Sequence, residues 1–368
     1  MDACNGSNIT CKDIRHISPD ETPLISAIMF AAGIIGNVAA LVILEIRRRR
    51  NMTTGSTSYH GLFHILIKSL VITDLTGTCL ITPLVQVSYA RNQTLVGMST
   101  GTWSFCWYFG VSMTFFSLAT MLLLFTTTLE RCFAITYPYL YNRHVTKKCA
   151  YIAILLVFLL STLFCLLPFA GFGEYVQYCP GTWCFIHMSP ETPVNRVYAI
   201  LYATIMLVLV LAIIVFNGFV MYQLYRMYQR RKRNGSVTVA MRSNSDRKVM
   251  SIAEEVEHLI LLVFMTVIFS ICTLPLVIRV YLTGQENYTL EVNALRFISI
   301  NSIVDPWVFI LLSPGVQHFC WASVCRSPLG ASRASVFNPP LAKEKSATYL
   351  EQPQPTLYME HIDSVENV

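Results

Sequence analysis

Long apolar segments alternate with short polar ones along most of the chain. Seven of them approach or exceed the length of about 20 helical residues that a bilayer crossing requires. They run over Pro23–Ile46, Leu62–Val87, Phe105–Leu129, Ala150–Phe172, Val197–Tyr225, Leu259–Val280 and Ala294–Leu312. A barrel strand would be about half as long and would alternate polar with apolar residues. The pattern therefore predicts an all-α integral membrane protein, a bundle of seven transmembrane helices.

The segments on either side of residues 23–312 predict three further parts. Residues 1–22 are polar and contain no apolar signal segment, so the first helix is expected to direct membrane insertion itself. Residues 313–325 are amphipathic and predict a short helix on the membrane surface, where Cys320 and Cys325 are either acylated or unmodified. Residues 326–368 are rich in proline, serine and charge and predict a disordered tail.

Charged residues are scarce, and their placement predicts the orientation of the helices. Only 13% of residues are charged, against about 25% in soluble domains. The net charge of +6 comes from short basic clusters between apolar segments, which argues against nucleic acid as a partner. These clusters follow the first, third and fifth segments, starting with Arg47–Arg50. Because basic loops remain in the cytoplasm, we expect an extracellular N-terminus and a cytoplasmic C-terminus at the plasma membrane.

Sequons and cysteines fit the same orientation. The N-x-S/T triplets expected on the outer side, which predict a glycoprotein, start at Asn5, Asn8, Asn92 and Asn287. Those at Asn51 and Asn234 fall on the inner side and are expected to be chance matches. Disulfides can form on the outer side, where the cysteines are Cys4, Cys11, Cys106, Cys179 and Cys184. Their number is odd, so at least one lacks a partner within the chain.

Several polar residues fall at bilayer depth. Asp74 and Asp305 would each cost about 2.5–3.5 kcal/mol if they faced lipid, so they must face the interior of the bundle. With Asn37 and Thr120 they form a predicted polar cluster that either holds a cation or is a hydrogen-bonded packing network without an ion. We also expect Pro275 and Pro306 to act as pivots within their helices.

Arg296 lies about two turns inside the outer end of the seventh segment, and no acidic residue of that segment lies at its depth. Two interpretations remain open. The guanidinium could bind the carboxylate of a ligand, or it could extend to the outer surface of the membrane.

Enzymatic motifs are absent from the sequence. It contains no GxxxxGK[ST], HExxH, GxSxG or CxxC motif and no convergent nucleophile and base, so we expect neither an enzyme nor a cofactor. A transporter or channel is the alternative of a different class. It would show inverted repeats in two halves, and the seven unequal segments show no such repeat.

Several residues and longer segments identify a family. The single residues and short motifs are Asn37, Asp74, Cys106, Glu130-Arg131-Cys132, Pro275 and Asp305-Pro306. The longer matches are SYARNQTL (88–95), MTFFSLATM (113–121), QYCPGTWCF (177–185), EEVEHLILL (254–262) and LRFISINSIVDPWVF (295–309). Over Pro23 to Leu312 the chain resembles the prostanoid receptors, which are rhodopsin-like (class A) G-protein-coupled receptors.

The resemblance implies a lipid-binding site. In the family, residues of the types found at Arg296, Tyr89 and Thr182 bind the carboxylate of the ligand, and Ser26 matches a further polar contact. Met113 and Ser117 lie four residues apart on one helix face and are expected to line the channel for the fatty chain. The resemblance also implies a disulfide between Cys106 and Cys184 and a second one from Cys179 to either Cys11 or Cys4, beneath a lid that leaves lateral entry from the bilayer.

The resemblance further implies signalling through G proteins. Within the family the matches favour the cAMP-raising subgroup, and in it a receptor for prostaglandin E2 that activates the stimulatory G protein (Gs). Receptors for prostaglandin D2 or prostacyclin are the alternatives. The residues expected to couple to the G protein or to change on activation are Glu130, Arg131, Tyr137, Pro138, Glu255 and Pro275. In the resting state Glu255 is expected to pair with Arg131. Arrestin and receptor kinases are further expected partners.

Overall fold

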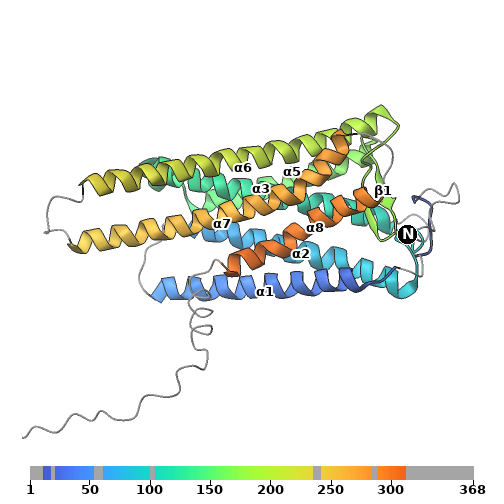
Figure 1. Cartoon of the computed structure of the whole chain (residues 1–368), viewed down its shortest axis with the longest axis horizontal. Coiled ribbons are helices and arrows are strands. Elements are labelled where there is room, and N and C mark those ends of the chain that lie inside the picture. The colour runs from blue at the N-terminus through green and yellow to red at the C-terminus, as the bar shows by residue number, and fades with distance from the viewer. Residues whose placement is uncertain are drawn as a thin grey trace, which may run out of the picture. The chain divides into compact units, whose positions relative to one another are not determined.

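Seven long helices lie side by side in a bundle (Figure 1). The computed structural model describes residues 11–17, 21–53, 61–99, 104–234, 242–282 and 288–311. The long helices are α1 (Leu24–Thr53), α2 (Gly61–Arg91), α3 (Phe105–Thr136), α5 (Lys147–Leu166), α6 (Pro193–Asn234), α7 (Arg242–Tyr281) and α8 (Tyr288–Leu311). Each contains a stretch that is long and apolar enough to cross a membrane. The prediction of a seven-helix membrane bundle is therefore confirmed.

The long helices extend beyond the predicted segments. α6 continues to Asn234 and α7 begins at Arg242, whereas hydropathy placed the corresponding ends at Tyr225 and Leu259. The added turns are rich in Arg, Lys and Glu, which form helices well in water but carry no apolar signal. α8 likewise begins at Tyr288, six residues before the predicted Ala294.

Shorter elements lie between the long helices. α4 (Pro138–His144) follows α3, and a 3-10 turn, η1 (Leu167–Ala170), follows α5. The predicted fourth helix therefore ends before Phe172, because Gly171 adopts a left-handed conformation (φ 82°) that terminates it.

A two-stranded antiparallel hairpin, β1 (Tyr175–Tyr178) and β2 (Trp183–Ile186), covers one end of the bundle. We call this end the hairpin end and the opposite one the Arg131 end. Tyr175 points inward, with its hydroxyl 3.2 Å from that of Tyr198. Burial raises the pKa of Tyr175, so the phenol stays neutral.

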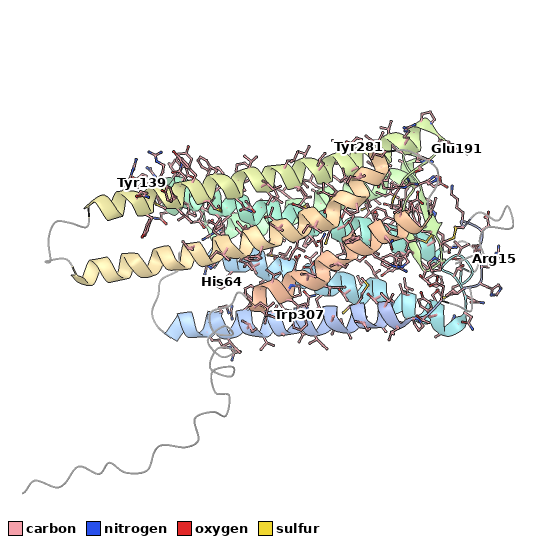
Figure 2. The ribbon with its side chains drawn as sticks, in the orientation of Figure 1. Arg15, His64, Tyr139, Glu191, Tyr281 and Trp307 are labelled. Carbon is pink, nitrogen blue, oxygen red and sulfur yellow. A yellow bond between two sulfur atoms is a disulfide. The ribbon has the colours of Figure 1, made fainter. Side chains whose placement is uncertain are left out.

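Two disulfides fix the cover at the hairpin end. Cys106 of α3 is joined to Cys184 of β2, and Cys11 is joined to Cys179, with 5.3 Å between the Cα atoms of each pair. The segment 11–17 therefore lies against the hairpin, where Gln177 Nε2 donates to the Ile14 carbonyl at 3.0 Å. In Figure 2, Arg15 and Glu191 lie at this end and Tyr139 lies toward the other.

The sequon at Asn92 lies at the hairpin end, directly after α2. Asn92 is exposed, while Thr94, the third residue of the sequon, is buried and donates to the Ile14 carbonyl at 2.6 Å. Other predicted features lie outside the described residues: Asn5, Asn8, Asn287, Cys4, Cys320, Cys325, the surface helix 313–325 and the tail 326–368.

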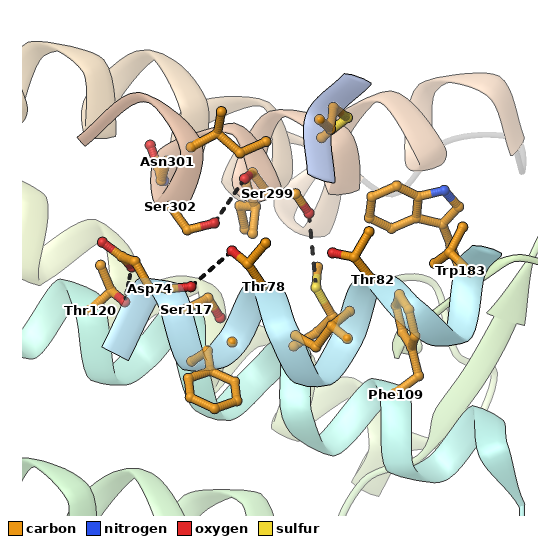
Figure 3. A pocket seen from close by; sticks show the side chains of 18 of the residues that line it. Asp74, Thr78, Thr82, Phe109, Ser117, Thr120, Trp183, Ser299, Asn301 and Ser302 are labelled. Carbon is orange, nitrogen blue, oxygen red and sulfur yellow. Dashed lines mark hydrogen bonds between the residues drawn. The ribbon is translucent and has the colours of Figure 1, made fainter. Parts of the chain in front are cut away.

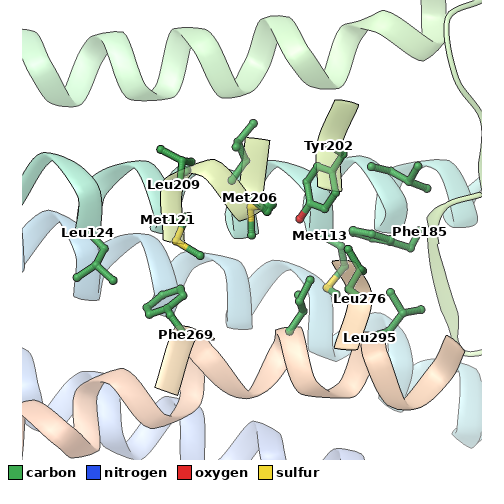
Figure 4. Packing of buried hydrophobic residues seen from close by; sticks show 14 of the residues in the cluster. Met113, Met121, Leu124, Phe185, Tyr202, Met206, Leu209, Phe269, Leu276 and Leu295 are labelled. Atoms are coloured by element: carbon green, nitrogen blue, oxygen red, sulfur yellow. The ribbon is translucent and has the colours of Figure 1, made fainter. Parts of the chain in front are cut away.

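The core is apolar and rich in methionine. Met113 and Met121 of α3 pack with Met206 of α6 and Phe269 of α7 (Figure 4). Methionine side chains are flexible and fill irregular gaps between helices. Met113, Met206 and Phe269 also border a cavity on the side of α1, α2 and α8, so this core forms part of the cavity wall.

Candidate ligand-binding site

A cavity lies within the bundle, lined mainly by side chains of α1, α2, α3 and α8, with Trp183, Met206 and Phe269 completing its wall (Figure 3). Phe109 and Trp183 form its wall near the hairpin end, with ring centroids 6.0 Å apart. Its opposite end reaches Asp74 and Asn301. Its lining combines apolar side chains with a few polar groups, as is typical of sites that bind small molecules.

One face of α2 provides much of the cavity wall. Asp74, Thr78, Thr82 and Val85 all line the cavity, and their spacing of four, four and three residues places them on one side of a helix. Sequence reasoning identified Asp74 but missed the others. The signal was present, because the buried charge of Asp74 marks the inward face of the helix.

The residues predicted to bind a ligand fall into two groups. Ser26, Met113 and Ser117 line the cavity itself. Tyr89, Thr182 and Arg296 lie at its hairpin end: Tyr89 is one turn beyond Val85, Thr182 precedes Trp183, and Arg296 is two residues before Ile298. The second group forms what we call the anchor group.

The described residues satisfy the polar groups of the anchor group only in part. The Tyr89 side chain interacts with Thr182 and with the charge of Arg296. Thr182 is fully buried, and apart from this contact with Tyr89 its hydroxyl meets no hydrogen-bond partner among the described residues. Arg296 is half-buried, and its closest described polar contact is Asn293 Oδ1, at 3.5 Å from Nη1. The group thus presents a cation and hydroxyls to any anion placed beside it.

Arg279 provides a comparison at the same end of the bundle. Its Nη2 lies 3.1 Å from Glu291 Oε1, and both side chains are nearly buried. Arg296 forms no ion pair with a described residue. Of these two arginines, only Arg296 therefore has a charge that the described chain leaves uncompensated.

The predicted polar cluster lies at the bottom of the cavity. Thr120 Oγ1 donates to Asp74 Oδ1 at 3.0 Å, and Asn37 Nδ2 donates to the Ser302 carbonyl at 3.0 Å. Asp305 is buried within electrostatic range of Asp74, and neither of its carboxylate oxygens has a partner in the described part of the chain. Two buried carboxyl groups this close require a bound cation or a proton.

Arg131 is enclosed at the other end of the bundle. Its side chain is 2% exposed, and Nε and Nη2 each lie 2.6 Å from a carboxylate oxygen of Glu130, which also accepts a hydrogen bond from Tyr141. The guanidinium lies over the Phe63 ring at 4.7 Å, and this ring packs 4.2 Å from the ring of His258 on α7.

Other residues predicted for coupling lie near this enclosure. Tyr137 is 54% exposed and Pro138 begins α4. Glu255 belongs to α7, but its side chain lies outside the described residues, so the predicted pairing with Arg131 stays a prediction. Pro275 lies inside α7 as expected from the sequence.

Comparison with known proteins gives the family. Residues 36–309 match the family described as 7 transmembrane receptor (rhodopsin family). The crystal structure of squid rhodopsin shares the fold, with a TM-score of 0.62 and 15% identity over 82% of this chain and 85% of that one. The Prostaglandin E2 receptor EP2 subtype of Rattus norvegicus is 44% identical over 334 residues, which cover 88% of this chain and 92% of the relative. The chain belongs to the prostanoid receptors.

A second group of relatives supports the same family. The Prostacyclin receptor of Mus musculus is 41% identical to the receptor described here over 311 residues, which cover 83% of this chain and 71% of the relative. The receptor is therefore a multi-pass plasma membrane protein and not an enzyme.

Proposed function

We propose that the receptor binds prostaglandin E2 at the extracellular side and activates the stimulatory G protein, which raises cAMP. The relatives named for prostaglandin E2 support this ligand, and those named for prostacyclin leave that lipid as the second candidate. The basic loops support an extracellular hairpin end and a cytoplasmic Arg131 end.

The unpartnered polar groups of the anchor group carry the proposal. Thr182 has a buried hydroxyl whose one described polar neighbour is Tyr89, and Arg296 has a charge without a described counter-ion. A ligand carboxylate placed there would accept hydrogen bonds from the hydroxyls of Tyr89 and Thr182 and would neutralise the guanidinium of Arg296. Its hydrocarbon chain would occupy the cavity past Ser26 and Met113. An acidic lipid matches this combination of one cationic end and a long apolar slot.

The enclosed Arg131 supports the signalling part of the proposal. Activation would separate Arg131 from Glu130 and open the Arg131 end between α3, α6 and α7, so that a G protein could contact Arg131, Tyr137 and Pro138. Pro275 within α7 provides a pivot for this movement. Arrestin and receptor kinases would use the same end after activation.

The proposal is tested by measuring cAMP in cells that express the receptor or its Arg296→Ala variant. We expect prostaglandin E2 to be more potent than prostaglandin D2 or a stable prostacyclin analogue. Arg296→Ala should lower affinity by about 30- to several-thousand-fold, because removing a buried charge partner costs roughly 2–5 kcal/mol. Arg196→Ala is the control, since Arg196 is exposed at the same end of the bundle.

Three other results are informative when the wild-type receptor and its variants are expressed equally at the cell surface. A more potent response to prostaglandin D2 or prostacyclin would retain the carboxylate site and replace the ligand. A normal response of Arg296→Ala would contradict the anchor group. Binding of prostaglandin E2 without any rise in cAMP would contradict the coupling to the stimulatory G protein.

A further inference from the structure

The end of α6 extends past the level at which the apolar part of the bundle ends. At the Arg131 end, Leu224 of α6 packs in one cluster with Cys132 of α3 and Leu259 of α7. Leu259 directly follows His258, where the membrane-spanning part of α7 begins. From Leu224 to Asn234, α6 continues for about 15 Å and projects past α1 and α8 (Figure 1). The end of α6 therefore lies at the level of the lipid headgroups and beyond them.

The outward face of this segment carries tyrosine and arginine side chains. It continues the exposed stripe of α6 that faces lipid, in which residues recur every three or four positions: Val208, Leu211, Val215, Phe219 and Tyr222. Tyr225, Arg226 and Arg230 are exposed on the same side of the helix. We call Tyr222, Tyr225, Arg226 and Arg230 the α6 outer face. Its order, from apolar to aromatic to cationic side chains, is that of a helix leaving the hydrocarbon core of a membrane.

Two contacts order the side chains of the α6 outer face. The guanidinium of Arg226 lies over the Tyr222 ring, 5.7 Å from its centroid. Gln229 Nε2 donates to the Tyr225 hydroxyl at 2.8 Å. A cation–π contact positions a guanidinium but leaves its charge uncompensated. Arg226 therefore remains able to bind an anion.

Acidic residues are absent from this part of the sequence. The chain contains no Asp or Glu between Glu191 and Asp246. Arg226 and Arg230 form no ion pair with any residue that the structure describes. The sequence adds three basic residues in the last turn of α6, Arg231–Arg233. The end of this helix is thus strongly positive, and the described part of the chain does not neutralise it.

α1 provides a comparison at the same end of the bundle. Arg48 and Arg49 lie 3.2 and 3.3 Å from Glu45 Oε1, so both arginines are paired within the helix. The two helices therefore carry basic residues at the same end, and only those of α1 have an acidic partner among the described residues.

A phospholipid headgroup complements the α6 outer face in charge and in position. A guanidinium binds two oxygens of one phosphate. Arg226 and Arg230 are one helical turn apart, about 6 Å along the axis, so they can hold two phosphate groups of the same headgroup. Basic residues that follow a membrane-spanning helix on the cytoplasmic side attract anionic lipids in this way. The tyrosines favour a lipid over a soluble anion, because they continue the lipid-facing stripe.

We propose that the α6 outer face binds a phospholipid whose headgroup carries more than one phosphate, in the leaflet at the Arg131 end. The lipid would hold the end of α6 at the membrane surface. The opposite face, which packs on α3 and α7 through Leu224, would remain available for the movements of signalling. The inference is independent of the prostanoid that the receptor binds.

The test is native mass spectrometry of the full-length receptor in detergent, titrated with phosphatidylinositol 4,5-bisphosphate. Arg226→Gln combined with Arg230→Gln should weaken the tightest binding event by roughly 5- to 30-fold, because two charges that contact phosphate are removed. Arg48→Gln combined with Arg49→Gln is the matched control. It removes the same charge at the same end from residues that Glu45 already pairs, and we expect a change below about 2-fold.

Two further measurements examine the aromatic and lipid parts of the site. Tyr222→Leu should weaken binding by roughly 2- to 5-fold, because the stacking that orients Arg226 is lost. Inositol 1,4,5-trisphosphate, which carries phosphates but no acyl chains, should not displace the lipid at equal concentration. A phosphatidylinositol 4,5-bisphosphate with a photoreactive acyl chain should crosslink to residues 215–230 of the wild-type receptor in nanodiscs.

Three results would each overturn the inference. They are an equal loss of binding from the two arginine pairs, displacement of the lipid by an equal concentration of the soluble trisphosphate, and crosslinks that map only to other helices. The crosslinking experiment uses the wild-type chain, so it does not depend on the folding of a variant. None of these measurements contains a prostaglandin, so failure of the proposed function would leave them unchanged.

Discussion

Asp74 and Asp305 place two carboxyl groups in the middle of the bundle, and the described residues give them few partners. Of their four oxygens, only Asp74 Oδ1 accepts a hydrogen bond from a described side chain, that of Thr120. Their mutual repulsion can be relieved in two ways, by a monovalent cation between them or by a shared proton. The two alternatives differ in their response to salt.

We expect a bound cation, and therefore a specific effect of sodium on stability. Sodium chloride should raise the melting temperature of the detergent-solubilised receptor by roughly 2–4 °C relative to choline chloride, because a ligand stabilises the state that binds it. Asp74→Asn should abolish this difference. Glu45→Gln, which changes a half-buried acid on α1 that pairs with Arg48, should retain it. Equal melting temperatures of the wild-type receptor in both salts would favour the shared proton.

The residues of the binding site were predictable to different degrees. Arg296, Tyr89 and Thr182 were expected from the resemblance, and Asp74 from the cost of a charge in lipid. Thr82 was not expected, because the sequence shows two threonines of the same type, Thr78 and Thr82, on one helix face. Only the structure shows that Thr78 already donates to a carbonyl, whereas Thr82 donates to no described residue.

At the level of the helices, a stack of three side chains joins α2, α3 and α7 at the Arg131 end. Arg131 lies over Phe63 of α2, and the Phe63 ring packs on His258 of α7. Movement of α7 away from the bundle would remove His258 from this stack and expose Phe63. The stack therefore favours the closed arrangement of the three helices.

We expect His258→Ala to raise basal activity. Loss of a cation–π or aromatic contact typically costs about 0.5–1 kcal/mol, which would shift the resting equilibrium by roughly 2- to 5-fold. The measurement is cAMP without ligand, normalised to surface expression. His144→Ala is the control, since His144 is exposed on α4 at the same end. Unchanged basal cAMP in His258→Ala would contradict a restraining role for the stack.

The elements illustrate what hydropathy can and cannot predict. The seven membrane crossings were predicted because lipid requires long apolar helices. The β1–β2 hairpin was not, because each strand has four residues and β1 is buried throughout, so no polar–apolar alternation marks it. The polar ends of α6 and α7 were missed because they lie beyond the apolar segments.

At the scale of the whole molecule, orientation in the membrane determines which end meets the ligand. The basic loops predict that the hairpin end is extracellular. Asn5 and Asn8 would then be accessible to glycosylation, whereas Asn51 and Asn234 would face the cytoplasm.

Glycosidase treatment tests the orientation. We expect it to reduce the apparent mass of the wild-type receptor, and replacement of all four outer sequon residues, Asn5, Asn8, Asn92 and Asn287, by Gln to remove that reduction. Asn51→Gln with Asn234→Gln is the matched control and should leave it unchanged. A reduction that depends on Asn51 or Asn234 would show that the membrane topology is inverted.

The position of Pro275 in α7 gives the helix unequal arms. From Pro275 to Arg242 the helix extends about 50 Å, whereas Phe269, which lines the cavity, lies only about 9 Å from the proline. If α7 turned as a stiff rod about Pro275 by about 10°, Phe269 would move by about 1.6 Å and the far end by about 9 Å. The far end of α7 would thus move more than five times as far as Phe269. A ligand would therefore need to displace Phe269 by little more than the length of one covalent bond.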